Sequence, residues 1–584
     1  MHKESLGEWD YVTIALTMVI SVLIGLYFRF TGNRQKTTTE FLMAGKNMGR
    51  LPVVFSLVVT KLSAIAIIGE PTDIYLYGTQ RCIGYIFIFV GSLVDAYVFL
   101  PVYFAVGAST IYEYLELRFG IKTRRAISFL GYIQTLLNMS VVIYTPAIAL
   151  SAVTEINPEY SVVLIGVVCI LLSSLGGLKA VMWADVFQAV MMYACLIALL
   201  SQCLYEAGGF KEVYRAAYDG GRMDFFNFTG DFRIPYTFWN SLSYGVQFGV
   251  AHCVNQFEVQ RLLAVRNLKI SQSAALWSSI PSFVMAFLTT TVGLALYAVF
   301  RNCDPLNEKS GIGLTKADQV VPYYIVSRLI GYPGLVGLCI SGILCASLSS
   351  LSSALNSLST VFVEDFVNAS FTKRSKPSAL KLNILAKALV IMHGIAIIGL
   401  TFMTSRFKSV LQAVVVLDGM VLGPSLGVYI LGVFTKRSNE LGVLIGLTTA
   451  AFFSIWFGLG TSLFGNTYEG LPFHNKDCIP NQWNATVYSY SSPYLKSETT
   501  NSTLSVDMKR YFPMYGISYI WTYCIGAALT IIIGYTASRI IDCQKKPAPV
   551  DPKLLCPLVK SRHSQIPEEH DIILKPSGRS STSS

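Results

Sequence analysis

Residues 58–71 read VVTKLSAIAIIGEP, an apolar run that holds one lysine, Lys61, and ends in a Gly-Glu-Pro interruption. Such a run is typical of a helix that crosses a membrane, and the interruption at 69–71 predicts that this helix is discontinuous. Irregular backbone and charge at the depth of a membrane are tolerated only where they are buried in protein or face a cavity. The stretch therefore predicts an integral membrane protein with an internal cavity beside Lys61.

The composition of the whole chain agrees with a membrane protein. Of its 584 residues, 53% are hydrophobic and only 14% are charged, which excludes an ordinary soluble globular protein. Long continuous apolar runs do not resemble the short alternating strands of membrane barrels, so the expected fold class is all-helical. About thirteen spans are expected, beginning near Tyr11, Leu51, Cys82, Ala126, Tyr160, Val181, Tyr236, Ser273, Gly334, Leu382, Val410, Leu441 and Gly516.

The formal net charge of +11 reflects topology better than a nucleic-acid partner, because most basic residues lie in short loops between spans. Placing those loops in the cytoplasm leaves the N-terminus extracellular and the C-terminus cytoplasmic, although segment 207–235, which then lies outside, is also basic. Residues 1–540 form the transmembrane domain, and the polar segment 541–584 is expected to be a disordered cytoplasmic tail. Candidate glycosylation sites in the outer loops are Asn227, Asn484 and Asn501, and a candidate disulfide there joins Cys303 and Cys478.

A second unusual span covers residues 334–366, where the core reads CASLSSLSSALNSLST (345–360). Small residues on a membrane helix permit close packing, and this reading stays open. The alternative is an ion site, because a dehydrated Na⁺ requires hard oxygen ligands such as hydroxyls and the carbonyls freed at a broken helix. Nucleotide-binding loops and catalytic signatures are absent from the sequence, so neither an ATP-driven pump nor an enzyme is expected, and no cofactor is expected.

Several motifs in order along the chain resemble the sodium/solute symporter family, in the branch of monocarboxylate, multivitamin and iodide transporters. They include GEPTDIYLYGTQ (69–80), LGGLKAVMWADVFQ (175–188), VNQFEVQR (254–261) and ASLSSLSSALNSLSTVFVEDF (346–366). The resemblance implies a LeuT-like five-plus-five inverted repeat, with one extra N-terminal helix and two extra C-terminal helices. It also implies alternating access around a site near the membrane midplane.

The resemblance further implies two sets of functional residues. The expected sodium ligands are the carbonyls of Val59, Leu62 and Ala346 and the hydroxyls of Ser349 and Ser350, with Asp185 on the inward exit path of Na⁺ or, in the alternative reading, at the start of an interfacial helix. The expected substrate pocket is lined by Lys61, Ser63, Ala66, Tyr144, Phe248, His252, Val415 and Asp418. Lys61, Ala66, His252 and Asp418 depart from the residues usual in the family.

Lys61 is open to three interpretations, since a lysine this deep in a membrane costs roughly 2.5–3.5 kcal/mol to insert unless it faces a cavity or a partner. It could be the counter-charge for an anionic substrate, with His252, Tyr144 and Ser63 as hydrogen-bond partners. It could pair with Asp418 and leave the pocket for a neutral solute. It could also stand in for a bound cation, which would weaken sodium coupling.

We therefore expect a multi-pass plasma-membrane protein that imports a small organic solute together with Na⁺, and a monocarboxylate or a similar anion is the favoured solute. The alternatives are a sodium-independent or proton-linked carrier of a neutral sugar-like or vitamin solute, and a solute sensor that does not transport. The expected partners are Na⁺, the small-molecule substrate and the lipid bilayer. The sequence does not give the substrate, the sodium stoichiometry or the oligomeric state.

Overall fold

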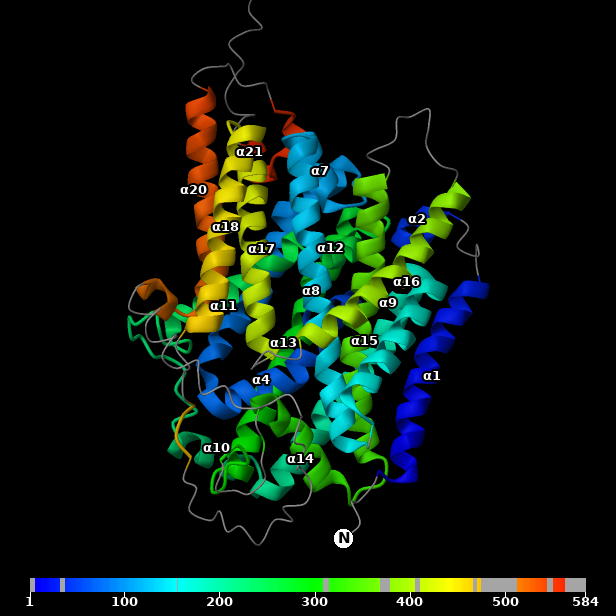
Figure 1. The fold of residues 1–584 in the computed structure, drawn as a ribbon, viewed down its shortest axis with the longest axis vertical. Coiled ribbons are helices and arrows are strands. Elements are labelled where there is room, and N and C mark those ends of the chain that lie inside the picture. The colour runs from blue at the N-terminus through cyan, green and yellow to red at the C-terminus, as the bar shows by residue number, and fades with distance from the viewer. Residues whose placement is uncertain are drawn as a thin grey trace, which may run out of the picture.

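The computed structural model describes residues 6–31, 37–154, 156–307, 314, 316–367, 379–404, 410–465, 470–473, 512–542 and 550–561. In these ranges the regular secondary structure is helical, and the one β-bridge joins Met48 and Val265 without forming a strand. The helices stand side by side in a bundle, and α1 (Glu8–Phe30) lies at its edge (Figure 1). The all-helical fold class is confirmed.

Ten helices in the described parts of the chain are long and apolar enough to cross a membrane, or eleven if one bent pair counts as a span. The expected number of thirteen is therefore not confirmed. The long helices are α1, α8 (Ile121–Val153), α9 (Pro158–Ala207), α13 (Leu268–Phe300), α15 (Leu335–Val361), α16 (Ala379–Thr404), α17 (Val410–Phe434), α18 (Glu440–Phe464) and α20 (Thr522–Asp542). A further span at 79–106 combines η2 (Thr79–Tyr85), α5 (Ile86–Val94), the π-turn η3 (Asp95–Phe99) and α6 (Leu100–Val106).

Two features explain the difference in number. Two expected spans run together in the 50 residues of α9, which contains a non-helical break at Gly177 with φ 59°. A Cβ there would lie 2.7 Å from the Phe41 carbonyl oxygen, so only glycine fits. The span expected near Tyr236 is divided into α11 (Phe238–Val250), the turn η4 (Ala251–Val254) and α12 (Gln256–Leu263), each too short to cross alone.

The discontinuous helix is present, but its break lies elsewhere than the sequence predicts. Helix α3 (Arg50–Lys61) and helix α4 (Ala64–Tyr77) meet at a 50° bend around Leu62 and Ser63, and not at 69–71. The Ser63 side chain accepts a hydrogen bond from the Ile65 N–H at 3.3 Å and caps α4. Pro71 lies inside α4, so the helix tolerates a proline that lacks one backbone donor.

Helix α15 forms the centre of the bundle. Its most apolar stretch is 89% buried, more than in any other described span, and it packs against α9, α8 and α3. The serines and alanines of α15 are small enough for neighbouring backbones to approach closely. This packing places the hydroxyl groups of α15 against the break between α3 and α4.

Residues 550–561, inside the expected disordered tail, pack on the protein. They form η11 (Pro552–Leu554) and α21 (Pro557–Ser561), which contact α6, η3 and α7 (Ile111–Arg118). Leu554 is 8% exposed and Cys556 is fully buried. The Cys556 N–H donates to the Val433 carbonyl at 3.0 Å, and the Tyr114 hydroxyl donates to the Leu554 carbonyl at 3.1 Å. Over these residues the prediction of disorder is wrong, because the Leu-Leu-Cys sequence buries apolar surface. Figure 1 shows this segment at the end of the molecule opposite to the one where α1 begins.

Candidate functional site

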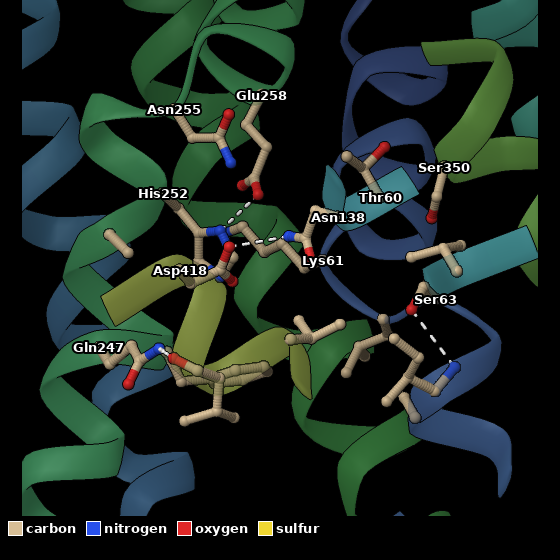
Figure 2. Close-up of a pocket in the computed structure, with 18 of the residues that line it drawn as sticks. Thr60, Lys61, Ser63, Asn138, Gln247, His252, Asn255, Glu258, Ser350 and Asp418 are labelled. Atoms are coloured by element: carbon tan, nitrogen blue, oxygen red, sulfur yellow. Dashed lines mark hydrogen bonds and ion pairs between the residues drawn. The ribbon is translucent and has the colours of Figure 1, made fainter. Parts of the chain in front are cut away.

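A cavity of about 120 Å³ lies at the break between α3 and α4. Side chains from α8, α11, α12, α15 and α17 complete its wall, so it lies among the helices of the bundle. Figure 2 shows Lys61 and Ser63 from the broken helix facing this space together with His252 and Asp418. The volume is smaller than the 300–1,000 Å³ typical of sites for drug-sized ligands, so the cavity suits a small solute.

Seven of the eight expected pocket residues line this cavity: Lys61, Ser63, Ala66, Phe248, His252, Val415 and Asp418. Tyr144 does not line it. The ring of Tyr144, on α8, instead lies 5.7 Å from the Lys316 ammonium. Residues that were expected from motifs in distant parts of the chain therefore line one cavity, and Tyr144 lies outside its wall.

Lys61 and Asp418 share the cavity without forming an ion pair in the structure. Asp418 Oδ1 instead accepts hydrogen bonds from Gln134 Nε2 at 2.6 Å and from Asn138 Nδ2 at 2.8 Å. Within the described ranges, Lys61 has neither a hydrogen bond nor a carboxylate within 4.0 Å. The Lys61 ammonium is therefore available to a ligand that carries negative charge.

His252 is held by a neighbour that the sequence did not single out. Its Nδ1 is hydrogen-bonded to Glu258 Oε1, and its ring meets the Phe248 ring edge-on with centroids 5.7 Å apart. Glu258 belongs to the VNQFEVQR motif, and it lines the cavity with Asn138 and Gln247. The spacing of Gln134 and Asn138, four residues apart on one helix face, was the available signal for this polar wall.

The carboxylate of Glu70 at the cavity wall is already paired with Arg81. Arg81 Nη2 lies 3.0 Å from Glu70 Oε1, and Arg81 Nη1 lies 2.7 Å from Asp73 Oδ2. The Tyr85 hydroxyl donates to Glu70 Oε2 at 2.6 Å, and the Arg81 guanidinium stacks 4.1 Å from the centre of the Tyr244 ring. Because Glu70 is paired with Arg81, it does not form an ion pair with Lys61 in this structure.

Four of the five expected sodium ligands lie close together beside the cavity. Ser349 Oγ lies 2.9 Å from the Ala346 carbonyl and 3.2 Å from the Val59 carbonyl, and Ser350 Oγ lies 3.2 Å from the Ala346 carbonyl. Leu62 closes α3 with φ −115° and ψ 83°, a non-helical backbone whose carbonyl is not committed to the regular helix. Carbonyl and hydroxyl oxygens are the ligands that a hard cation such as Na⁺ prefers.

Asp185 lies on α9 and is joined to the serines of α15 through Arg261. Its Oδ2 accepts a hydrogen bond from Ser56 Oγ at 2.5 Å and lies 3.7 Å from Arg261 Nη2. Arg261 also donates to Ser353 Oγ, and Ser353 donates to the Ser349 carbonyl at 2.5 Å. A chain of polar contacts therefore joins Ser349 to Asp185 through Ser353 and Arg261. The sequence did not indicate that Arg261 belongs to this site.

The expected outer-loop features are only partly described. Asn227 is partly exposed, and its Oδ1 accepts a hydrogen bond from the Thr229 N–H at 3.0 Å. Cys303 is disulfide-bonded. Asn484, Asn501 and Cys478 lie outside the described residues.

Comparison with known proteins gives consistent matches over most of the chain. The model of the sodium:solute symporter family matches residues 41–450. A sodium-coupled monocarboxylate transporter 1 from Homo sapiens is 34% identical over 91% of this chain and 87% of its own length. A sodium-dependent multivitamin transporter from Oryctolagus cuniculus is 32% identical over 96% of this chain and 86% of its own. Among solved structures, a Na⁺-coupled sialic acid symporter in a substrate-bound outward-open state aligns with a TM-score of 0.75 at 19% identity, over 93% of this chain and 99% of that chain.

Proposed function

Because the chain belongs to the sodium:solute symporter family, we propose that it imports a small monocarboxylate together with Na⁺ across the plasma membrane. The family consists of transporters and not enzymes, Na⁺ is its coupling ion, and the chain is a multi-pass membrane protein. We propose the substrate class, the plasma-membrane location and the extracellular N-terminus. The names of the monocarboxylate transporters that it resembles support the substrate class.

One observation carries the choice of an anion: Lys61 faces a small cavity at the helix break, and among the described residues no carboxylate lies within 4.0 Å of its ammonium group. Because the Lys61 side chain is partly buried and makes no close ion pair, a ligand that brings a carboxylate gains a charge-assisted hydrogen bond there. The Ser63 hydroxyl and the His252 ring are the neighbouring groups that would orient that carboxylate.

The coupling of solute transport to Na⁺ follows from the position of Ser349 and Ser350 on α15. We place Na⁺ among the Val59, Leu62 and Ala346 carbonyls and the Ser349 and Ser350 hydroxyls. Ser350 also lines the cavity, and Val59, Lys61 and Leu62 all lie within the last turn and the cap of α3. Binding of Na⁺ would therefore order the backbone that presents Lys61, so that each ligand favours the other's site. Asp185 and Arg261 would lie on the path by which Na⁺ leaves inward.

Transport would proceed by alternating access around this site, with the inverted repeat that the resemblance implies. Na⁺ entry is favoured by its concentration gradient and by the membrane potential, which contributes roughly 2.3 kcal/mol per charge at 100 mV. When a monocarboxylate enters with one Na⁺, the two charges cancel, and the concentration gradient alone drives uptake. With two or more Na⁺ the potential also contributes.

Uptake of labelled solutes into cells that express the protein tests the proposal. The panel contains monocarboxylates, vitamins, sugars and iodide, each measured in external Na⁺ and with choline in its place. We expect concentrative, Na⁺-dependent uptake of a short monocarboxylate. Undiminished uptake in choline would contradict sodium coupling, and preferred uptake of a neutral sugar would contradict the role given to Lys61. Binding and current without tracer accumulation would identify a sensor.

A further inference from the structure

The wall of the cavity holds an excess of unused hydrogen-bond acceptors. Asn138 Oδ1, Gln247 Oε1 and Glu258 Oε2 are shielded from solvent and find no hydrogen-bond partner in the described part of the chain. These three residues line the cavity and are 6%, 5% and 2% exposed, respectively. Because buried polar atoms in folded proteins are nearly always paired, unpaired ones at a cavity indicate a ligand that pairs them.

The identity of the free atoms is fixed by the neighbours of the two amides. Asn138 Nδ2 donates to Asp418 Oδ1 at 2.8 Å, and Gln247 Nε2 donates to the Val415 carbonyl at 2.9 Å. Reversing either amide would place two acceptors against each other, so the free atom is the oxygen in both cases. The free Glu258 atom is a carboxylate oxygen, since the other oxygen faces His252. All three atoms therefore require donors from the ligand.

The three acceptors come from three helices. Asn138 belongs to α8, Gln247 to α11 and Glu258 to α12. In Figure 2, Gln247 and Glu258 lie on opposite sides of His252, and Asn138 lies next to Lys61. Acceptors that come from three helices suit a solute with separate hydroxyl groups better than one whose donors all belong to a single ammonium group.

We propose that the transported monocarboxylate is hydroxylated, with its carboxylate on Lys61 and its hydroxyl groups donating to Asn138, Gln247 and Glu258. This inference rests on the proposed function and narrows its substrate class. A plain fatty acid would satisfy Lys61 but would leave the acceptors buried and unpaired. Sites that are built to bind a hydroxyl discriminate strongly against an analogue that lacks it. The volume of about 120 Å³ favours a short carbon chain.

A matched series of acids tests the proposal in wild-type protein. Propionate, lactate and glycerate share a three-carbon skeleton and carry none, one and two hydroxyl groups. Each competes, in the presence of Na⁺, with uptake of labelled lactate, and direct uptake of each labelled acid is measured as well. We expect the apparent affinity to improve at least tenfold from propionate to glycerate. Propionate that competes as well as glycerate would overturn the inference and leave the proposed function standing.

Two further results of these uptake and competition experiments would each lead to a different conclusion. If Na⁺ drives uptake of none of the three acids, the proposed function itself fails. Alanine replaces the lactate hydroxyl by an ammonium group, so alanine that competes better than glycerate would overturn the assignment of hydroxyl donors in favour of a single cationic donor.

Two glutamine variants test whether Gln247 contributes to the preference for hydroxylated acids. Gln247→Met removes one free acceptor, so the ratio of glycerate affinity to propionate affinity should fall at least threefold. Gln260 is the control, because it is 1% exposed and also has an unpaired Oε1, but its Nε2 bonds to the Leu42 carbonyl at 2.7 Å and it does not line the cavity. Gln260→Met should keep the wild-type ratio. An unchanged ratio in Gln247→Met would contradict the role of Gln247, and the ratio does not depend on how much protein reaches the membrane. The wild-type series decides the inference if a variant does not fold.

Discussion

The charge of Lys61 is the feature of a single residue on which substrate recognition most depends. Lys61→Met keeps most of the length of the side chain but removes the ammonium group, and a hydrogen bond to a charged group contributes about 1.5–3 kcal/mol. The apparent KM for the carboxylate should therefore rise roughly 10- to 150-fold. The control Lys179→Met removes an exposed lysine that lies over the Phe28 ring, and it should leave uptake unchanged. Normal carboxylate uptake by Lys61→Met would refute the counter-charge role.

Two hydroxyl groups of α15 are predicted to set the affinity for sodium. Ser349→Ala and Ser350→Ala each remove one oxygen from the proposed Na⁺ ligands, so the Na⁺ concentration that gives half-maximal uptake should rise at least fivefold, by about 1 kcal/mol or more. Ser359→Ala is the matched control, because Ser359 Oγ donates to the Ala386 carbonyl at 2.8 Å, away from the cavity. Sodium activation curves in intact cells make the comparison. Wild-type curves for both site variants would argue for packing alone.

At the scale of elements, the close approach of α4 and α13 holds the broken helix in place. A Cβ on Gly293 would lie 2.5 Å from the Pro71 carbonyl oxygen, so Gly293→Ala must push the two helices apart. Overpacking of this kind costs typically about 1–3 kcal/mol. We expect a lower thermal midpoint in detergent and weaker uptake. Gly399→Ala is the control, because nothing lies within 4 Å of its Cβ position. Equal midpoints for the two variants would contradict this account of the packing.

A second element-scale prediction concerns the short turn η6 (Ala317–Gln319) and the start of α17. Asp318 Oδ2 accepts a hydrogen bond from the Val410 N–H at 2.9 Å, and burial raises the pKa of the Asp318 carboxyl from 3.8 to about 6. Between these two values the folded protein binds more protons than the unfolded chain, so this group lowers stability as pH rises through that window. Above about pH 6 the loss is complete.

Asp318→Asn keeps an acceptor for the Val410 N–H and removes the charge. The thermal midpoint of the variant should therefore exceed that of the wild type at pH 7.5, and the difference should shrink towards pH 5. Asp231→Asn changes an exposed aspartate that bonds locally to the Arg233 N–H and should show no such pH-dependent difference. A constant difference between Asp318→Asn and wild type across this range would show that the Asp318 charge is not the cause.

The elements themselves differ in how far the sequence could predict them. Long apolar helices such as α17 were predictable, because hydropathy is a local property of the chain. The break at Leu62 and Ser63 was not located, because Ser63 reads as an ordinary small residue until its cap on α4 is seen. Asn138 and Gln247 were missed for a related reason. A single amide in an apolar helix looks like packing until the fold shows which cavity it faces.

At the scale of the whole molecule, alternating access requires that contacts at one end of the bundle break while those at the other end close. A cluster around Arg124 ties the end of the bundle that carries residues 550–561. Arg124 Nε donates to Asp365 Oδ1 at 2.7 Å, and Arg124 Nη1 lies 2.5 Å from Glu116 Oε2. These contacts join α8 to α7 and to the π-turn η7 (Phe362–Val367) after α15. The side chain of Asp365 is fully buried, so it depends on its partners for compensation.

Arg124→Met should open this end of the molecule. Removing one partner of a buried pair costs about 3–5 kcal/mol, because the remaining charge is left uncompensated, and hydration of Asp365 in an opened state relieves that cost. Cys556 is fully buried at the same end. Its modification by a maleimide that cannot cross membranes should therefore become faster in inverted vesicles, as measured by mass spectrometry of the peptide that contains Cys556.

The double variant Arg124→Met/Asp365→Leu removes the uncompensated charge and should restore slow labelling. Arg539→Met, at an exposed position near the end of α20, should label like the wild type. Slow Cys556 labelling together with normal uptake in Arg124→Met would mean that this cluster does not hold the end closed.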